Sequence, residues 1–215
     1  MLMGWTKRDR GSDAEIADAW EGLAPGQVEL TYAEGIVNGN LIATENGWLA
    51  VEAISPGDKV LTFDNGVDRV LEVSRKNLWN GSGACPRAMW PLAVPSGALG
   101  NCRAMLVLPD QNVMLESDMA EELFGDPFAL VPASALQGYR GISRVCPAGK
   151  IEIISLRFAE DQVVYSNGSG MLHCGSIDGL GMTIDFVISA GPYAPLPYDR
   201  ARKLLALMTD AEIAV

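Results

Sequence analysis

Short runs of aliphatic and β-branched residues recur through the middle of this 215-residue chain, separated by Gly, Asn, Asp and Pro. Runs of this length, bounded by residues that favour turns, are typical of β-strands. The pattern predicts an all-β region, and periodicity alone limits it to a sandwich or a barrel. The runs are QVELTY, NLIAT, KVLTF, RVLEVS, AMLVL, NVML, EIISLRF and QVVYS, all between residues 27 and 166.

A short amphipathic helix is predicted before the β region, at residues 12–23. Ile16, Trp20 and Leu23 recur there at helical spacing, and Ser12 with Glu15 matches a capping box. Within the β region, SDMAEELFG and PASAL favour small helical insertions between strands.

A second helix is predicted at residues 199–210, with Asp199 as its N-cap. Its apolar residues share one face, which we expect to pack on the core or on a partner because it would otherwise expose a large apolar patch. The residues of this face are Ala201, Leu204, Leu205 and Met208. The predicted organisation is an N-terminal helical appendage (1–31), a β domain (32–175) and a C-terminal extension with a terminal helix (176–215).

The charge balance restricts the partners. The chain has 27 acidic and 16 basic residues and a net charge of -11. Binding to phosphate backbones needs clustered Lys and Arg, so nucleic acid is not an expected partner. No apolar run approaches the roughly 20 residues that cross a bilayer, and no secretory signal is evident. We expect no membrane contact and a cytoplasmic location on synthesis; export by a signal-less route and incorporation into a larger assembly stay open.

The four cysteines, Cys85, Cys102, Cys146 and Cys174, are widely separated. None forms the close pairs that zinc sites use, so no metal is predicted. Because the chain shows no secretory signal, we expect each cysteine to be a small buried hydrophobe rather than a disulfide partner or a reactive thiol. Four cysteines allow three pairings, and the sequence does not choose among them.

Six motifs follow one another through the β region: GNLIAT, VEAISPGDKVLT, GALGN, LPDQNVML, FGDPFALVPASAL and VVYSNG. Their combination and order resemble the bacterial branch of the Hint family, the module shared by Hedgehog autoprocessing domains and inteins. The resemblance covers about residues 32–175 and implies a compact all-β Hint-type fold with a pseudo-twofold pair of curved hairpin units. The residues of Pro56-Gly57-Asp58 favour a tight turn before a strand, which fits this architecture.

The resemblance also indicates where catalytic residues would lie. In the family, a thiol or hydroxyl on the first residue of the domain attacks the preceding carbonyl carbon. The corresponding position in this sequence is Gly35. Glycine has no side chain and so provides no nucleophile. The family's hydroxyl and histidine, which position the scissile bond and protonate its nitrogen, correspond to Leu108 and Gln111. Leucine does neither, and glutamine donates no proton near neutral pH. A further family histidine corresponds to Asp161, which is still able to act as a base.

The chain has one histidine, His173, and it is followed by Cys174. The pair resembles the histidine and nucleophile at the C-terminal junction of an intein, although inteins carry Asn or Gln directly after that histidine. Neighbouring residues of a strand point to opposite faces, so adjacency does not make a dyad. We interpret the pair as a surface or half-buried histidine beside a small hydrophobe, with a catalytic dyad as the alternative.

Two functions follow from these positions. The first is a catalytically degenerate Hint domain, not an enzyme, that acts as a structural or protein-interaction module with an unidentified protein partner. The alternative is a self-processing domain that uses an unorthodox nucleophile such as Cys174, with His173 as base. The glycines of residues 166–185 complete no phosphate-binding loop, so no cofactor is expected.

Overall fold

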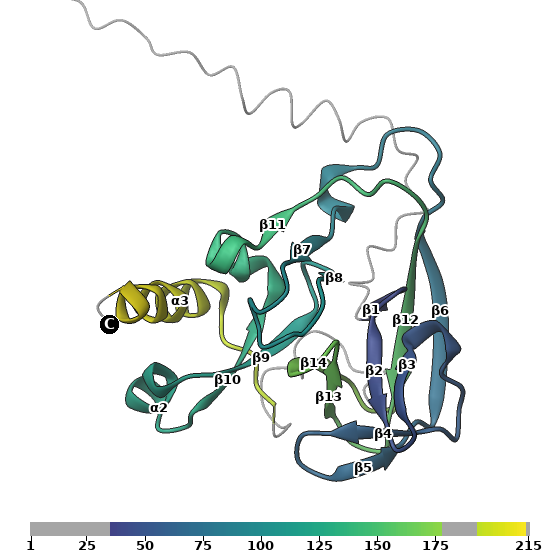
Figure 1. Cartoon of the computed structure of the whole chain (residues 1–215), viewed down its shortest axis with the longest axis horizontal. Coiled ribbons are helices and arrows are strands. Elements are labelled where there is room, and N and C mark those ends of the chain that lie inside the picture. Colours follow the sequence, from purple (N-terminus) through teal and green to yellow (C-terminus); the bar gives the residue numbers. More distant parts are fainter. Residues whose placement is uncertain (1–34, 178–192, 214–215) are drawn as a thin grey trace, which may run out of the picture. The chain divides into compact units, whose positions relative to one another are not determined.

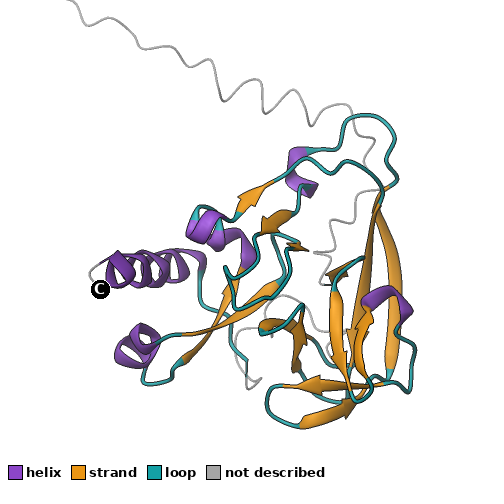
Figure 2. Ribbon diagram, viewed as in Figure 1, coloured by secondary structure: helices purple, strands orange, loops and turns teal. Residues whose placement is uncertain are grey.

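The computed structural model describes residues 35–177 and 193–213, all of which belong to one compact unit, Ala33–Val215. Strands predominate in these residues, and the helices are short except for the one near the C-terminus (Figures 1 and 2). The all-β fold class is therefore confirmed. The expected helix at 12–23 and the expected strand QVELTY lie outside the described residues.

The largest sheet is antiparallel and gathers strands from both ends of the β region. Its strands are β2 (Leu41–Thr44), β3 (Gly47–Ala50), β4 (Lys59–Thr62), β5 (Gly66–Arg69), β9 (Asn112–Glu116), β10 (Phe128–Pro132), β13 (Gln162–Ser166) and β14 (Gly170–Cys174). Their order is β10-β9-β14-β13-β2-β4-β5, and β3 pairs with β2 (Figure 1). The predicted runs NLIAT, KVLTF, NVML and QVVYS become β2, β4, β9 and β13.

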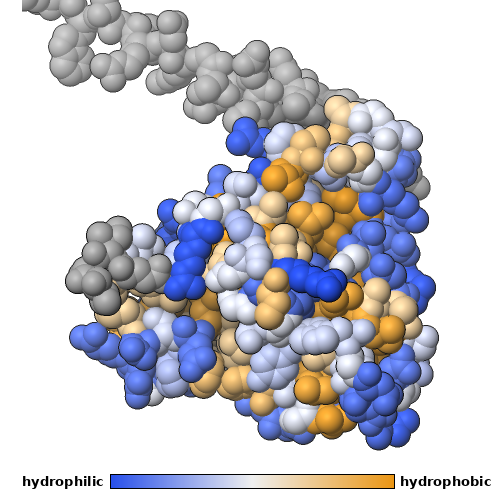
Figure 3. Space-filling model, viewed as in Figure 1, coloured by the Kyte–Doolittle hydropathy of each residue, from blue (hydrophilic) through white to orange (hydrophobic). Residues whose placement is uncertain are grey.

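Two smaller antiparallel sheets complete the described β structure. One has the order β1-β12-β6 and the other β11-β7-β8. Their strands are β1 (Ile36–Val37), β12 (Ile151–Arg157), β6 (Glu72–Trp79), β11 (Ser143–Arg144), β7 (Leu92–Val94) and β8 (Met105–Val107). The edge strand β6 exposes Arg75 and Lys76, and hydrophilic residues line that edge of the molecule in Figure 3. Charges of this kind oppose edge-to-edge pairing with another chain.

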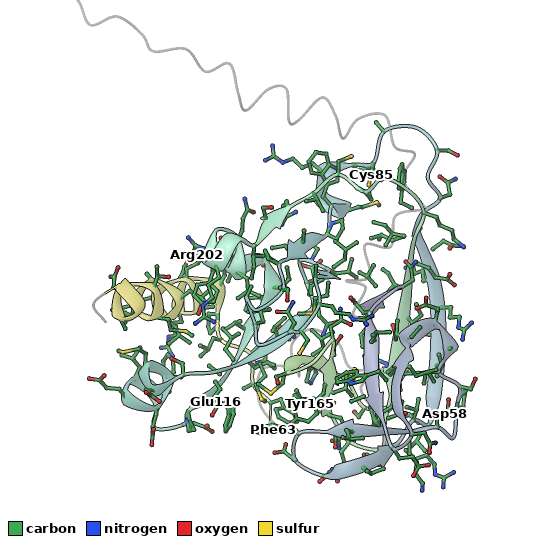
Figure 4. All side chains as sticks on the ribbon, in the orientation of Figure 1. Asp58, Phe63, Cys85, Glu116, Tyr165 and Arg202 are labelled. Atoms are coloured by element: carbon green, nitrogen blue, oxygen red, sulfur yellow. The ribbon has the colours of Figure 1, made fainter. Side chains whose placement is uncertain are left out.

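The Pro56-Gly57-Asp58 segment forms the predicted tight turn. Gly57 has a φ of 98°, a left-handed conformation that glycine adopts without steric cost. The Ser55 N–H donates to Asp58 Oδ2 at 2.9 Å, and the Asp58 N–H donates to the Ser55 carbonyl at 3.1 Å. The turn leads directly into β4 (Asp58 is labelled in Figure 4).

The helical insertions predicted from SDMAEELFG and PASAL are both present. Ser117 caps α2 (Asp118–Phe124) by accepting a hydrogen bond from the Met119 N–H, and Gly125 ends it with a φ of 79°. PASAL forms the 3-10 helix η3 (Ala133–Leu136). Three further 3-10 turns are η1 (Val51–Ala53), η2 (Arg87–Met89) and η4 (Tyr139–Gly141).

The predicted terminal helix is α3 (Tyr198–Ile213), and it docks on its own domain. Its predicted apolar face is buried, and the helix packs against η3, β10 and α2. Arg202 adds hydrogen bonds from Nη1 to the carbonyls of Ala135 and Gln137, at 2.9 and 2.8 Å (Figure 4). Asp199 lies inside the first turn rather than before it, because the helix begins at Tyr198. A carboxylate there still favours the positive end of the helix dipole.

The prediction that all four cysteines are buried is wrong for two of them. Cys85 and Cys174 are buried, whereas Cys102 and Cys146 are exposed, and none of the four is in a disulfide. The exposed pair lies outside the strands, in the turn after Asn101 and in the connection after β11, where no core packs over them. In the described residues, no helix has the length and apolar character needed to cross a membrane.

Candidate functional site

Gly35 lies at the start of β1, where the chain enters its pairing with β12. Ile36 is opposite Ile154 in that antiparallel ladder, so Gly35 comes beside Ser155. A Cβ built on Gly35 would lie 2.8 Å from Ser155 Oγ and closer still to Ile153 Cγ2, whereas real Cβ atoms essentially never approach other atoms within 3.0 Å. The Ile153 Cγ2 is attached to a β-branched carbon with a restricted rotamer, so it does not swing away easily. Only glycine fits at residue 35 without a shift of Ile153 and Ser155.

His173 and Cys174 end β14, and their side chains face opposite sides of the sheet. Cys174 and Leu172 pack in the main hydrophobic core. Met171 packs in a smaller apolar cluster on the other side, together with Tyr193, whose ring meets the His173 ring edge-on at 5.8 Å. This alternation is the one expected of a strand. His173 and Cys174 therefore do not form a facing dyad.

Asp161 lies beside the imidazole of His173. Asp161 Oδ2 is 3.7 Å from His173 Nε2, which is an ion-pair distance rather than a hydrogen bond. Asp161 Oδ1 accepts a hydrogen bond from the Ser176 N–H at 2.7 Å. The interaction with His173, followed by that with Ser176, holds the pKa of Asp161 below its ordinary value of 3.8, although partial burial opposes the shift. Asp161 is thus an anion at neutral pH.

The His173 ring is buried, not at the surface or half-buried as predicted, and Tyr193 and Asp161 lie against it. Its side chain is 9% exposed, and neither ring nitrogen has a hydrogen-bond partner among the described residues. The backbone carbonyl of His173, by contrast, is well bonded: it accepts from Gln111 Nε2 at 2.7 Å.

Gln111 precedes β9, and its side chain serves the backbone. It is 1% exposed, and Nε2 donates to the carbonyls of both His173 and Asn112, at 2.7 and 3.0 Å. These bonds tie the end of β14 to the start of β9. A primary amide in this arrangement is a hydrogen-bond donor and not a source of protons near neutral pH.

Leu108 is a core residue. It is 4% exposed and packs in a small apolar cluster with Val37, Ile151 and Ile153. Its cluster lies beneath β1 and the adjoining part of β12. The Leu108 side chain has no polar group and contributes apolar packing only.

Gly35, His173 and Cys174 line one small pocket together with Ser155 and Arg157. The space that the centre of a water can occupy there is about 10 Å³, which is room for about one water. The structure therefore brings together residues that are more than 130 positions apart in the sequence. The pocket is too small for a small-molecule substrate.

Of the sequence-predicted residues, Gly35, His173 and Cys174 meet at this pocket. Gln111 and Asp161 both contact His173, the first at its carbonyl and the second at its ring. The remaining predicted residue, Leu108, belongs to the neighbouring apolar cluster instead.

Two polar residues at this pocket, Ser155 and Arg157, were not predicted. Both lie on β12, where EIISLRF indicates only a strand. They are two positions apart, so they lie on the same face of the strand. This spacing is the only feature of the local sequence that links the two residues. They reach Gly35 because β1 pairs with β12, and no local pattern specifies a pairing across such a separation.

A larger pocket, of about 250 Å³, lies between the β2–β3 turn and the turn before β4. It is lined in part by Trp48, which is half-exposed. Its charged groups are already paired, since Lys59 Nζ lies 3.0 Å from Glu45 Oε2 and Asp58 bonds the turn backbone. No predicted site residue lines it. Within residues 35–177 and 193–213, no group of three His, Cys, Asp or Glu side chains is arranged to hold a metal ion.

The chain matches a family model and is similar to several solved structures. The family model described as "Hint domain" matches residues 35–171, from Gly35 into β14. A bacterial intein-like domain from Clostridium thermocellum is similar in structure, with 15% identity, a TM-score of 0.48, and 67% of this chain and 99% of that one covered. The MchDnaB-1 intein (N145AA) and the gp41-1 intein each show 12% identity and a TM-score of 0.42, with 66% of this chain and 98% and 100% of theirs covered. No curated protein matches.

Proposed function

This chain belongs to the Hint domain family, and on that basis we propose that it is a non-cleaving member that serves as a structural or protein-interaction module. In this role the Hint scaffold is kept while the acyl shift at its first residue is lost. The chain stays in one piece and works through its folded surface.

One observation carries this proposal: the space that a nucleophile on residue 35 needs is filled. Ile153 Cγ2 and Ser155 Oγ occupy the region into which any Cβ at this position would project. An acyl shift requires a thiol or hydroxyl on that Cβ, within bonding reach of the preceding carbonyl carbon. Residue 35 therefore lacks both the nucleophilic group and the space for one, because β12 lies directly against it.

The state of Gln111 supports the same proposal. Breaking the peptide bond requires protonation of its nitrogen, and the side chain at the corresponding position is an amide that already donates to two carbonyls. Leu108, where the family carries a hydroxyl, is packed among aliphatic side chains. Gln111 and Leu108 thus stabilise the fold, one by hydrogen bonds and the other by apolar packing. Neither side chain is available to transfer a proton or to position a scissile bond.

An interaction role is supported by the surface near α2 and α3. Leu123 and Phe124, at the end of α2, are each 43% exposed, and Tyr198 at the start of α3 is 51% exposed. The two helices pack against one another. Neighbouring large apolar side chains that are exposed, as Leu123 and Phe124 are, are a common feature of protein-binding surfaces. Because the buried face of α3 is used within the domain, a partner would bind elsewhere.

The second candidate function is self-processing through Cys174, and one observation favours it. Cys174 lines the same pocket as Gly35, and His173, next in sequence, pairs with the Asp161 carboxylate. Its geometry is less suitable, however, since the thiol is 6% exposed in the main core and faces away from the imidazole. A thiol buried in apolar surroundings is a poor nucleophile, because burial disfavours the thiolate.

Chemical trapping separates these candidates. Freshly purified wild type and Cys174→Ala are incubated with dithiothreitol or with hydroxylamine, which cleave thioesters and esters, and each product is weighed by intact mass spectrometry. We expect one unchanged mass for both proteins under every condition. Fragments from wild type that disappear in Cys174→Ala would establish the second candidate and overturn the first.

A further inference from the structure

Two connections that are far apart in sequence run alongside each other in this fold: residues 80–91, which join β6 to β7, and residues 145–150, which join β11 to β12. At one end, Trp79 of β6 pairs with Ile151 of β12. At the other end, Leu92 of β7 pairs with Arg144 of β11. Both connections are therefore anchored at both ends to the same pair of ladders, in antiparallel sense.

Contacts beyond the ladders keep the two connections together. The Val145 N–H donates to the Pro91 carbonyl at 3.0 Å. From the opposite end, a Cβ built on Gly81 would lie 3.4 Å from Lys150 N, so the two backbones are in van der Waals range there. The interval between these two contacts is short on both sides: residues 82–90 on one connection and 146–149 on the other.

This interval contains one cysteine on each connection. Cys85 is 7% exposed, and its carbonyl accepts a hydrogen bond from Trp90 Nε1 at 2.9 Å, which fixes it close to the β7 end (Figure 4). Cys146 directly follows Val145 and is exposed. Burial raises the pKa of the Cys85 thiol, and the nearby Cys146 thiol raises it further. A thiol perturbs another in this way only when the two are close in space.

We propose that Cys85 and Cys146 form a reversible disulfide that fastens the β6–β7 connection to the β11–β12 connection. The other two cysteines are held elsewhere: Cys174 packs in the main core, and Cys102 packs against Gly168. Of the six single pairs that four cysteines can form, the fold thus favours Cys85 with Cys146. This inference is independent of the proposed function, because it concerns neither Gly35 nor self-cleavage.

The reaction is a thiol–disulfide exchange with a small disulfide such as oxidised glutathione. The exposed Cys146, as thiolate, attacks one glutathione sulfur, and a mixed disulfide forms as the first glutathione thiolate leaves. The Cys85 thiolate then attacks Cys146 Sγ, the protein disulfide forms and the second glutathione leaves. Two protein thiols are oxidised, one glutathione disulfide is reduced to two thiols, and both protons pass to the products. We expect Cys146 to react first because Cys85 is buried and its pKa is raised.

The test uses the full chain and variants at single cysteines. Wild type, Cys146→Ser and, as a matched control, Cys102→Ser are incubated with oxidised glutathione at low protein concentration and alkylated under denaturing conditions. Intact mass and peptide mapping then count and locate the thiols. Cys146 and Cys102 are both exposed, so neither substitution disturbs the core.

We expect wild type and Cys102→Ser to lose the Cys85 and Cys146 thiols together, as one internal cross-link that dithiothreitol reverses. Cys146→Ser should form no internal cross-link and keep Cys85 as a thiol. Oxidation should raise the melting temperature of Cys102→Ser by several degrees, because a cross-link between distant residues restrains the unfolded chain, and should leave that of Cys146→Ser unchanged. Stable glutathione adducts on Cys146 in Cys102→Ser, with Cys85 still alkylated after prolonged oxidation, would overturn the proposal.

Discussion

A Cβ on Gly35 would overlap Ile153 Cγ2, the closest approach found for any glycine of the described chain. The overlap arises because Ile36 and Val37 pair with Ile154 and Ile153, which brings β12 flat against the start of the domain. We propose that this close approach leaves no room for the nucleophile with which the chemistry of the family would begin.

Gly35→Ala should destabilise the fold. The added methyl group must displace β12 or Ile153, and overpacking of a buried site costs about 1–3 kcal/mol. The free energy of unfolding, measured by urea denaturation, gives the size of the loss. Gly149→Ala is the matched control, since no atom lies within 4 Å of its Cβ position and its φ is not positive. Equal free energies of unfolding for the two variants would show that the Gly35 site accommodates a methyl group.

Gln111→Leu should cost about 1–3 kcal/mol in the free energy of unfolding. The substitution leaves the carbonyls of His173 and Asn112 without their donor in a buried site. Gln137→Leu serves as the control, because the Gln137 side chain is exposed and surface changes usually stay within about 0.5 kcal/mol. If both variants unfold at the same urea concentration as wild type, the Gln111 side chain does not have the role assigned to it.

Leu204→Ala should destabilise the domain by about 2–4 kcal/mol, because Leu204 is fully buried under α3. The neighbouring Lys203 is exposed, and Lys203→Ala should change stability by less than about 0.5 kcal/mol. Hydrogen exchange of the α3 amides gives a second measurement: we expect protection in wild type and faster exchange in Leu204→Ala. Unprotected α3 amides in wild type would contradict docking of the helix.

Asp161 should contribute stability that depends on pH. Its folded pKa lies below the unfolded value, so its contribution is complete above about pH 4 and is lost as the pH falls through the folded pKa. The stability gap between wild type and Asp161→Asn should therefore be largest from about pH 5 upward and narrow below about pH 4. Asp210→Asn, at an exposed position of α3, is the control. A gap that widens on acidification would contradict the direction of the shift.

The local patterns of the sequence predicted the local structure well. The turn at Pro56-Gly57-Asp58, the helices from SDMAEELFG and PASAL, and the buried face of α3 all follow from residue type and spacing over a few positions. The opposite orientations of His173 and Cys174 also follow from strand alternation alone.

What the sequence did not predict depends on long-range pairing. The closure of β12 over Gly35, the arrival of Ser155 and Arg157 at the same pocket, and the alignment of the Cys85 and Cys146 connections all join segments tens to more than a hundred residues apart. The exposure of Cys102 and Cys146 was missed for a related reason, because burial of a small residue depends on what packs over it. Short-range periodicity carries no information on these contacts.

Gly35→Cys alone should give no self-cleavage. The new side chain meets the same overlap with Ile153 as any Cβ, and Gln111 supplies no proton to the leaving nitrogen. Intact mass spectrometry after incubation with dithiothreitol measures this directly, with wild type alongside. Thiol-dependent cleavage between residues 34 and 35 in the single variant would show that nucleophile loss is the only defect of the site.

The mass of the unmodified wild-type chain shows directly whether the domain cleaves itself. The 215-residue protein is synthesised in a protease-free cell-free system and sampled over hours by intact mass spectrometry, with N-terminal sequencing of every species. We expect a single species of full mass at every time. A fragment that ends at Glu34, or a species whose N-terminus is Gly35, accumulating with first-order kinetics independent of protein concentration, would contradict this expectation.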